Sequence, residues 1–117
     1  MAKARILHVD DDSAILRMVR RVLADYNVVS APSIEDARAE DAHGPFDLYI
    51  VDGKLKVPGD GFRYAQELQA TGKKVFLFTG ELPDTLPKGI LCLPKPSANA
   101  DILAMVSQVL AKGGAKP

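Results

Sequence analysis

The sequence predicts an α/β domain in which helices cover both faces of a parallel five-stranded sheet. Short apolar runs alternate with segments of helical spacing along the whole chain. The runs are four to six residues long and lack regular polar alternation, which is typical of strands buried on both faces. The connections between these units are short. Alternating strand and helix units with short connections favour a parallel sheet.

Length and composition set the outer limits of the prediction. The 117 residues suit one domain, expected at 1–112 with a flexible tail at 113–117. Fifteen basic and fifteen acidic residues cancel, so no electrostatic footprint for nucleic acid is expected. No apolar run approaches the ~18 residues that a membrane span needs. The single cysteine, Cys92, cannot form an internal disulfide, which favours a cytoplasmic setting.

The first half of the chain contains three of the predicted strands. The run 6–9 ends on three consecutive carboxylates: Asp10, Asp11 and Asp12. Helical spacing of apolar residues follows directly: Ile15, Met18, Val19, Val22 and Leu23. A second strand is expected at 26–31, and Ser33 is a favourable N-cap for the next helix. The third strand, 46–51, again ends on an acid, Asp52.

The second half repeats the pattern with one short unit. A loop that contains Asp60, expected to be solvated, leads into a helix at 62–71. Strands at 75–78 and 90–93 end on Thr79 and on Pro94-Lys95-Pro96. The last helix is expected from about Ser97, with these residues on its inner face: Ile102, Leu103, Val106, Val109 and Leu110. Only ten residues, two of them prolines, separate Thr79 from Ile90, so the helix between these strands is predicted to be short or missing.

At this size the commonest arrangement is a flavodoxin-like three-layer sandwich with strand order 2-1-3-4-5. That order brings the carboxyl ends of strands 1, 3, 4 and 5 together, and open α/β sheets bind ligands there. The residues placed at this edge are Asp10, Asp11, Asp52, Thr79 and Lys95. The sequence therefore predicts one polar site at the edge.

These groups suit phosphoryl transfer. A carboxylate such as Asp52 can attack phosphorus and form an acyl phosphate. The acids after the first strand, together with Asp52, can hold Mg²⁺, which prefers oxygen ligands. Thr79 and Lys95 can stabilise phosphoryl oxygens, which is most of what phosphoryl transfer requires. The alternative for the acidic triplet alone is a helix N-terminus, where Asp is a favoured cap.

Four short motifs resemble those of response-regulator receiver domains of the CheY-like family. They are V-D-D-D at 9–12, I-V-D at 50–52, Thr79 and Lys95-Pro96, and the likeness spans essentially the whole chain. The resemblance implies that Asp52 is the phosphoacceptor and that Lys95-Pro96 is a cis peptide. It implies that Asp10, Asp11, Asp52 and the backbone carbonyl of Lys54 bind Mg²⁺, and that Thr79 and Lys95 assist at the phosphoryl group.

The same resemblance implies partners and a role. A sensor histidine kinase or a histidine phosphotransfer protein would supply the phosphoryl group, and the signal would pass on by binding a downstream protein. Self-catalysed phosphotransfer and dephosphorylation would be the only chemistry, so the chain is expected to be a signalling domain and not an enzyme. Neither nucleic acid nor membrane is an expected direct partner.

Three features depart from the family pattern. The loop after Asp52 has one residue more than the commonest form before its glycine, Cys92 replaces an aromatic residue, and the unit after Thr79 is short. A second reading is therefore a pseudo-receiver that binds a partner without phosphorylation. A third is a haloacid-dehalogenase-like phosphatase, because Asp10-x-Asp12 mimics its first motif, although no further acidic pair follows Lys95.

Two smaller expectations concern residues near the site. His8 lies within the first strand, which favours a hydrogen-bonded or partly buried side chain over a metal ligand. Lys54 and Glu81 lie two residues past Asp52 and Thr79. Opposite charges there could pair over the phosphoryl group and exclude water, so a comparatively long-lived acyl phosphate is a hypothesis of the sequence.

Overall fold

Five parallel strands form a single sheet in the order β2-β1-β3-β4-β5. The computed structural model describes residues 3–80 and 89–114. The strands are β1 (Arg5–Val9), β2 (Asn27–Ala31), β3 (Leu48–Val51), β4 (Val75–Thr79) and β5 (Leu91–Pro94). The predicted flavodoxin-like strand order is confirmed.

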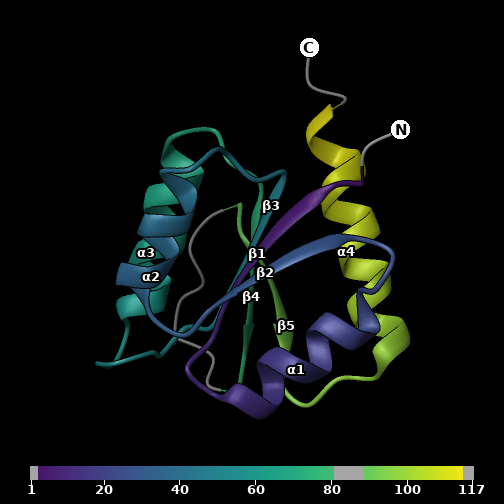
Figure 1. Cartoon of the computed structure of the whole chain (residues 1–117), viewed down its shortest axis with the longest axis horizontal. Helices are drawn as coiled ribbons and strands as arrows, with labels where there is room; N and C mark the ends of the chain where they lie inside the picture. The colour runs from purple at the N-terminus through teal and green to yellow at the C-terminus, as the bar shows by residue number, and fades with distance from the viewer. Residues whose placement is uncertain (1–2, 81–88, 115–117) are drawn as a thin grey trace.

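The helices of the described residues lie on both faces of the sheet. They are α1 (Ser13–Val22), α2 (Ile34–Asp41), α3 (Asp60–Ala70) and α4 (Asn99–Gly114). Figure 1 shows α2 and α3 on one side of the sheet and α1 and α4 on the other. The predicted short or missing helix between β4 and β5 falls on a segment of which 81–88 lie outside the described residues.

The two faces of the sheet bury separate apolar cores, because successive side chains of a strand point to opposite faces. Leu7 and Val9 of β1 pack in the core on the side of α2 and α3. Ile6 of the same strand packs in the core that contains Val19 of α1 and Ile102 of α4.

Local capping explains where the first two helices begin. The Asp12 carboxylate accepts the backbone N–H groups of Ala14 and Ile15 at 2.9 and 3.3 Å and caps α1. The Ser33 hydroxyl accepts the N–H of Asp36 at 3.0 Å and caps α2. Ser33 is therefore the N-cap that the sequence predicted, and Asp12 is the cap among the three carboxylates.

The last two helices differ from the prediction in where α3 begins and in which residues of α4 face inward. α3 begins at Asp60, two residues earlier than expected. Leu103 was placed on the inner face of the last helix, and this is wrong, because 39% of Leu103 is exposed. A helix turns by about 100° per residue, so the inward stripe through Ile102, Val106 and Val109 leaves Leu103 at its margin. The expected tail, 113–117, lies mostly outside the described residues, with α4 extending to Gly114.

No helix within the described ranges 3–80 and 89–114 has the length and apolar character that crossing a membrane requires.

Candidate functional site

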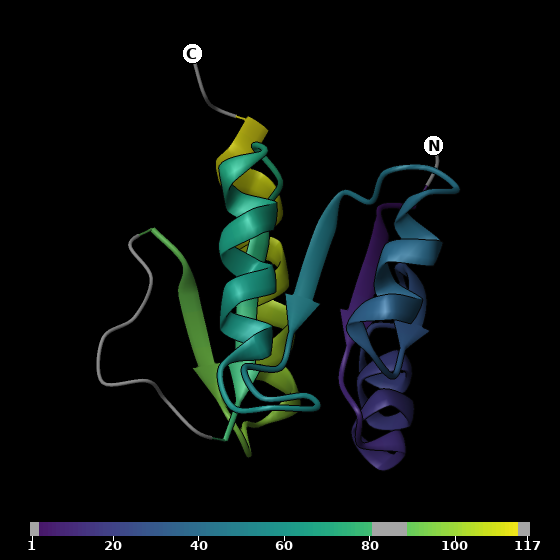
Figure 2. The ribbon, with the colours of Figure 1, turned by 90° about the vertical axis from the view of Figure 1, so that its left-hand side faces the viewer.

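The predicted site residues lie at one edge of the sheet. In Figure 2 the strand arrowheads point to the same, lower end of the molecule. β1 and β3 are neighbours, and Val9 pairs in register with Val51, so Asp10 and Asp52 follow at the same level. Asp10, Asp11 and Asp52 each offer a carboxylate oxygen within 4.8 Å of the others. The structure therefore brings together acids from two different strands.

Lys95, which follows β5, links two of these acids. Its Nζ donates to Asp10 Oδ2 at 2.5 Å and to Asp52 Oδ2 at 3.3 Å. Burial works to lower the pKa of the Lys95 ammonium, but the bonds and charges of Asp10 and Asp52 outweigh burial and raise the pKa. The side chain therefore stays positively charged between the two carboxylates. The Lys95-Pro96 peptide is cis, as the family resemblance implied.

Exposure differs among the acids. Asp10 has no exposed surface, Asp52 is 9% exposed, and Asp11 is exposed. Burial raises the pKa of the Asp10 carboxyl, although the bonds from Lys95 and from the backbone N–H of Asp12 oppose that shift. Asp52 is thus the acid that combines contact with Lys95 and a reachable surface.

Thr79 and Lys54 stand at the border of the cluster. Thr79 is the last residue of β4 and only 2% exposed, and its carbonyl accepts the backbone N–H of Lys95 at 3.0 Å. The backbone N–H of Lys54 lies 3.5 Å from Asp52 Oδ1, while its side chain is exposed. The peptide that follows Asp52 thus runs beside the acceptor carboxylate. Glu81, the expected partner of the Lys54 side chain, lies outside the described residues.

Asp60 is not the solvated loop residue that the sequence suggested, so that expectation is wrong. It is half-buried at the start of α3, and its carboxylate accepts the backbone N–H groups of three successive loop residues: Leu55, Lys56 and Val57 at 2.8, 2.9 and 3.2 Å. Asp-Gly before a helix is a turn signal that points to such bonds, because Asp accepts nearby backbone N–H groups. Sequence reasoning missed this residue.

His8 also departs from its prediction. It is fully buried on the face of β1 that packs against α1 and α4, and neither ring nitrogen has a hydrogen-bond partner among the described residues. Burial, with a smaller effect from the Lys95 charge, lowers the pKa of His8 to about 3. The expectation of a hydrogen-bonded or partly buried histidine is therefore wrong, and the imidazole is neutral near pH 7.

The donor set fits a hard divalent cation. Asp10, Asp11 and Asp52 contribute carboxylate oxygens, and the single ammonium of Lys95 balances only part of their charge. Mg²⁺ favours oxygen ligands and is usually held by one or two carboxylates. These residues therefore suit Mg²⁺ chemically.

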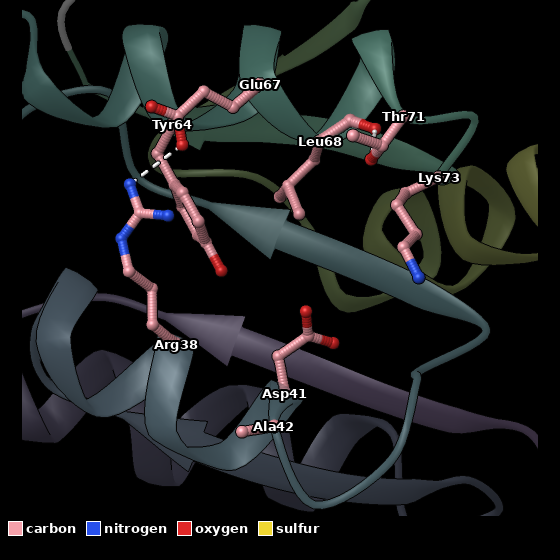
Figure 3. A pocket seen from close by; sticks show the side chains of 8 residues that line it. All are labelled: Arg38, Asp41, Ala42, Tyr64, Glu67, Leu68, Thr71 and Lys73. Carbon is pink, nitrogen blue, oxygen red and sulfur yellow. Dashed lines mark hydrogen bonds and ion pairs between the residues drawn. The ribbon is translucent and has the colours of Figure 1, made fainter.

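A separate hollow of about 340 Å³ lies between α2 and α3. Figure 3 shows its side chains, with the ion pair between Arg38 and Glu67 at 2.7 Å across one end. Both charged side chains are 56% exposed. None of the predicted site residues lines this hollow, so it is separate from the acidic cluster.

Solved structures that match this chain over most of its length include response-regulator receiver domains. A CheY-like receiver domain protein from Methanospirillum hungatei JF-1 has 27% identity and a TM-score of 0.82, and the match covers 97% of this chain and 98% of that one. The chemotaxis protein CheY4 of Vibrio cholerae has 27% identity and a TM-score of 0.77, covering 92% and 99%. The sequence matches no protein-family model and none of the curated proteins.

A third neighbour is the response regulator protein TrrA from Thermotoga maritima, solved in complex with Mg²⁺ and BeF. It has 23% identity and a TM-score of 0.79, covering 91% of this chain and 98% of that one, which shows the shared fold alone. The chain thus has the fold of CheY-like receiver domains over nearly its whole length. These neighbours support a role as a response regulator in two-component signalling.

Proposed function

We propose that this chain is a phosphoacceptor response regulator that takes a phosphoryl group from phosphohistidine onto Asp52. The observation that carries the proposal is the placement of Asp52: its carboxylate contacts Lys95, lies beside Asp10 and Asp11, and keeps some exposed surface. Asp10 has the same ammonium contact but no accessible surface. Asp52 is therefore the acid of the cluster that combines contact with Lys95 and a surface that a phosphodonor can reach.

The transfer exchanges one bond to phosphorus for another. A carboxylate oxygen of Asp52 forms a P–O bond while the P–N bond to the donor imidazole breaks, and the leaving imidazole nitrogen takes up a proton. Such a transfer depends mainly on in-line positioning and on neutralising charge on the phosphoryl oxygens. Lys95 supplies a positive charge 3.3 Å from Asp52 Oδ2, and Thr79 ends the neighbouring strand β4.

In this proposal the acidic residues also bind a metal ion. Asp10, Asp11, Asp52 and the backbone carbonyl of Lys54 would hold Mg²⁺, which when bound neutralises charge on phosphoryl oxygens. Lys95 already offsets part of the repulsion among the carboxylates in the absence of phosphate. Two unit charges of the same sign about 5 Å apart repel by roughly 3 kcal/mol at an effective dielectric of ~20, so a counter-charge here is needed.

Phosphorylation would change the surface of the domain through charge. A phosphoryl group adds about −1.5 to −2 charges at neutral pH, beside Lys95 and near the end of β4. The donor would be a sensor histidine kinase or a histidine phosphotransfer protein in the cytoplasm, and the readout would be binding of a downstream protein. The domain would act in signalling and not as a turnover enzyme.

Incubation with acetyl phosphate and Mg²⁺, followed by intact-protein mass measurement, tests the proposal. We expect a mass gain of one phosphoryl group that Asp52→Asn abolishes. Asp36→Asn, at an exposed aspartate of α2, is the matched control and should keep the gain. A wild-type protein that gains no mass would be a pseudo-receiver. Continuous phosphate release that requires Asp10 would instead indicate a phosphatase.

A further inference from the structure

The direction of the Lys54 carbonyl is tied to a side chain that lies outside the acidic cluster. The Lys54 carbonyl and the Leu55 N–H belong to one peptide group, and the cis bond recorded among the described residues is Lys95-Pro96. In a trans peptide the N–H and the C=O point in opposite directions within one plane. The Leu55 N–H donates to Asp60 Oδ1 at 2.8 Å. The position of that oxygen therefore sets the direction of the Lys54 carbonyl.

The carboxylate of Asp60 holds more than this one peptide. Its other oxygen accepts the N–H groups of Lys56 and Val57 at 2.9 and 3.2 Å. Burial works to raise the pKa of Asp60, but bonds from four backbone N–H groups outweigh burial and lower the pKa. The connection 52–59 is longer than the about two to six residues usual between a strand and a helix, and an ordering contact counters the extra freedom of a longer loop.

Asp60 is itself held rigidly. It begins α3, and the next residue, Gly61, donates its N–H to the Gly53 carbonyl at 3.0 Å. A Cβ on Gly61 would lie 1.7 Å from the backbone oxygen of Asp52, so only glycine permits this approach. The ring of Phe62 covers Gly53 in the same way, since a Cβ there would lie 2.5 Å from the ring. The backbone of the acceptor and the start of α3 therefore form one unit.

We propose that Asp60 is a positioning residue for the cation site, because its carboxylate orients the Lys54 carbonyl toward the metal that Asp10, Asp11 and Asp52 hold. The inference rests on the proposed function, in which that carbonyl is a ligand. Asp60 does not touch the metal or the phosphoryl group. It acts through the peptide group between Lys54 and Leu55. The Asp60 carboxylate accepts the N–H of that peptide, and the C=O of the same peptide points away from Asp60.

Titration calorimetry of Mg²⁺ binding tests the proposal with three proteins. Asp60→Asn keeps the size of the side chain but replaces one acceptor oxygen by a donor NH₂ group. We expect it to raise the dissociation constant for Mg²⁺ on the order of tenfold, the range found for residues that orient metal ligands. The control, Asp36→Asn, removes the same charge from the first turn of α2 and should leave the constant unchanged. Measurement at high ionic strength separates orientation from long-range charge.

A second measurement separates positioning from mere stability. The rate of phosphorylation by acetyl phosphate is followed as a function of Mg²⁺ concentration. A positioning role shifts the Mg²⁺ concentration at half-maximal rate and leaves the plateau rate unchanged. A merely structural role would also shift the half-maximal concentration, because Mg²⁺ draws unfolded protein back to the folded state, but only by the factor set by the folded fraction. Urea unfolding of Asp60→Asn without Mg²⁺ measures that fraction, and a shift no larger than it predicts would refute the positioning role.

The outcomes distinguish this inference from the proposed function. If the wild-type protein binds no Mg²⁺, the proposed function fails. If the wild-type protein binds Mg²⁺ and folded Asp60→Asn binds it equally well, the positioning role is refuted. Should Asp60→Asn not fold, Asp60→Ser retains one acceptor oxygen and is held to the same criterion in the same titration.

Discussion

β1 and β3 are neighbouring parallel strands that both end in valine followed by aspartate, yet the connections from these strands to the next helix differ in length. After β1, only residues 10–12 precede α1, and the N–H of Asp12 folds back onto Asp10 Oδ1 at 2.9 Å. After β3, residues 52–59 precede α3, and the corresponding N–H group, that of Lys54, lies 3.5 Å from Asp52 Oδ1, a longer contact than the one at Asp10. Asp10 has no exposed surface, whereas Asp52 is 9% exposed.

This difference shows how one residue type can take two roles at the same level of a sheet. A short turn encloses Asp10, which then serves as a fixed charge that holds the Lys95 ammonium. A long loop leaves Asp52 reachable, at the cost of a segment that must be ordered by other contacts. Substitutions in the long loop, at the partner of the enclosed carboxylate and in the strand beneath it test this difference.

Gly61→Ala is expected to have the largest effect, because it breaks the contact that orders the long loop. The added Cβ would lie 1.7 Å from the Asp52 backbone oxygen, so α3 must shift away from β3. We expect the free energy of unfolding in urea to fall by about 3 kcal/mol or more. Gly72→Ala is the control: its φ of 84° is strained for alanine, but nothing lies within 4 Å. Gly72→Ala should lower the free energy of unfolding by about 1–2 kcal/mol. Equal losses in Gly61→Ala and Gly72→Ala would mean that the close approach of Gly61 to Asp52 has no effect on stability.

Lys95→Met tests the enclosed carboxylate. Without the ammonium, Asp10 keeps its buried position but loses the 2.5 Å contact that balances its charge. Breaking one partner of a buried ion pair typically costs about 3–5 kcal/mol, and we expect the lower end because Asp52 loses a partner that water can partly replace. Arg38→Met removes the 2.7 Å pair with Glu67, where both side chains are 56% exposed, and should cost below about 1 kcal/mol. If Lys95→Met and Arg38→Met lower the free energy of unfolding by similar amounts, burial of Asp10 does not increase the contribution of its ion pair to stability.

His8→Leu tests the strand beneath Asp10 through the pH dependence of stability. The unfolded chain protonates His8 near its ordinary pKa of 6.5, while burial lowers the pKa in the folded protein to about 3. The stability from neutral His8 is therefore complete above pH 6.5 and is lost as the pH falls toward 3. In the wild-type protein this loss should be about 1.4 kcal/mol per pH unit in that window.

Urea unfolding of the wild-type protein and of His8→Leu at several pH values measures this loss. The difference in unfolding free energy between the two proteins should grow steadily in favour of the variant as the pH falls. His43→Gln, at an exposed histidine, should keep the wild-type slope. Parallel curves for wild type and His8→Leu would show that the folded protein accommodates a charged His8.

The parts of this molecule that follow from strand ends could be predicted from sequence. The apolar runs set where each strand stops, and a parallel sheet then brings Asp10, Asp52 and Lys95 to one edge whatever the details of packing. The cap at Ser33 was predictable for a similar reason, since it depends on residues three positions apart.

The parts that depend on contacts across the fold could not be predicted in this way. The Asp-Gly turn signal indicates that Asp60 can accept nearby backbone N–H groups, but that three of them reach it depends on where α3 begins and how it packs on β3. His8 is enclosed because α1 and α4 close over β1; the apolar run around it indicates a buried strand, but it does not show whether the ring nitrogens find hydrogen-bond partners. Leu103 fitted an apolar stripe whose exact margin is set by how α4 is rotated on the sheet.

Lys54→Ala should have the smallest effect. It tests whether the long loop after β3 shields Asp52 from water. The Lys54 side chain is exposed, so it can shield an acyl phosphate on Asp52 from water only by a solvent-screened interaction. Such interactions contribute about 0–1 kcal/mol, which limits the increase in the hydrolysis rate to roughly fivefold. We expect the variant to lose its phosphoryl group faster by a factor within that limit, measured by intact mass after removal of the donor. Lys56→Ala, which removes an exposed charge two residues further on, should leave the lifetime unchanged. If Lys54→Ala loses phosphate no faster than the wild-type protein, the long loop leaves Asp52 open to water as well as to the phosphodonor.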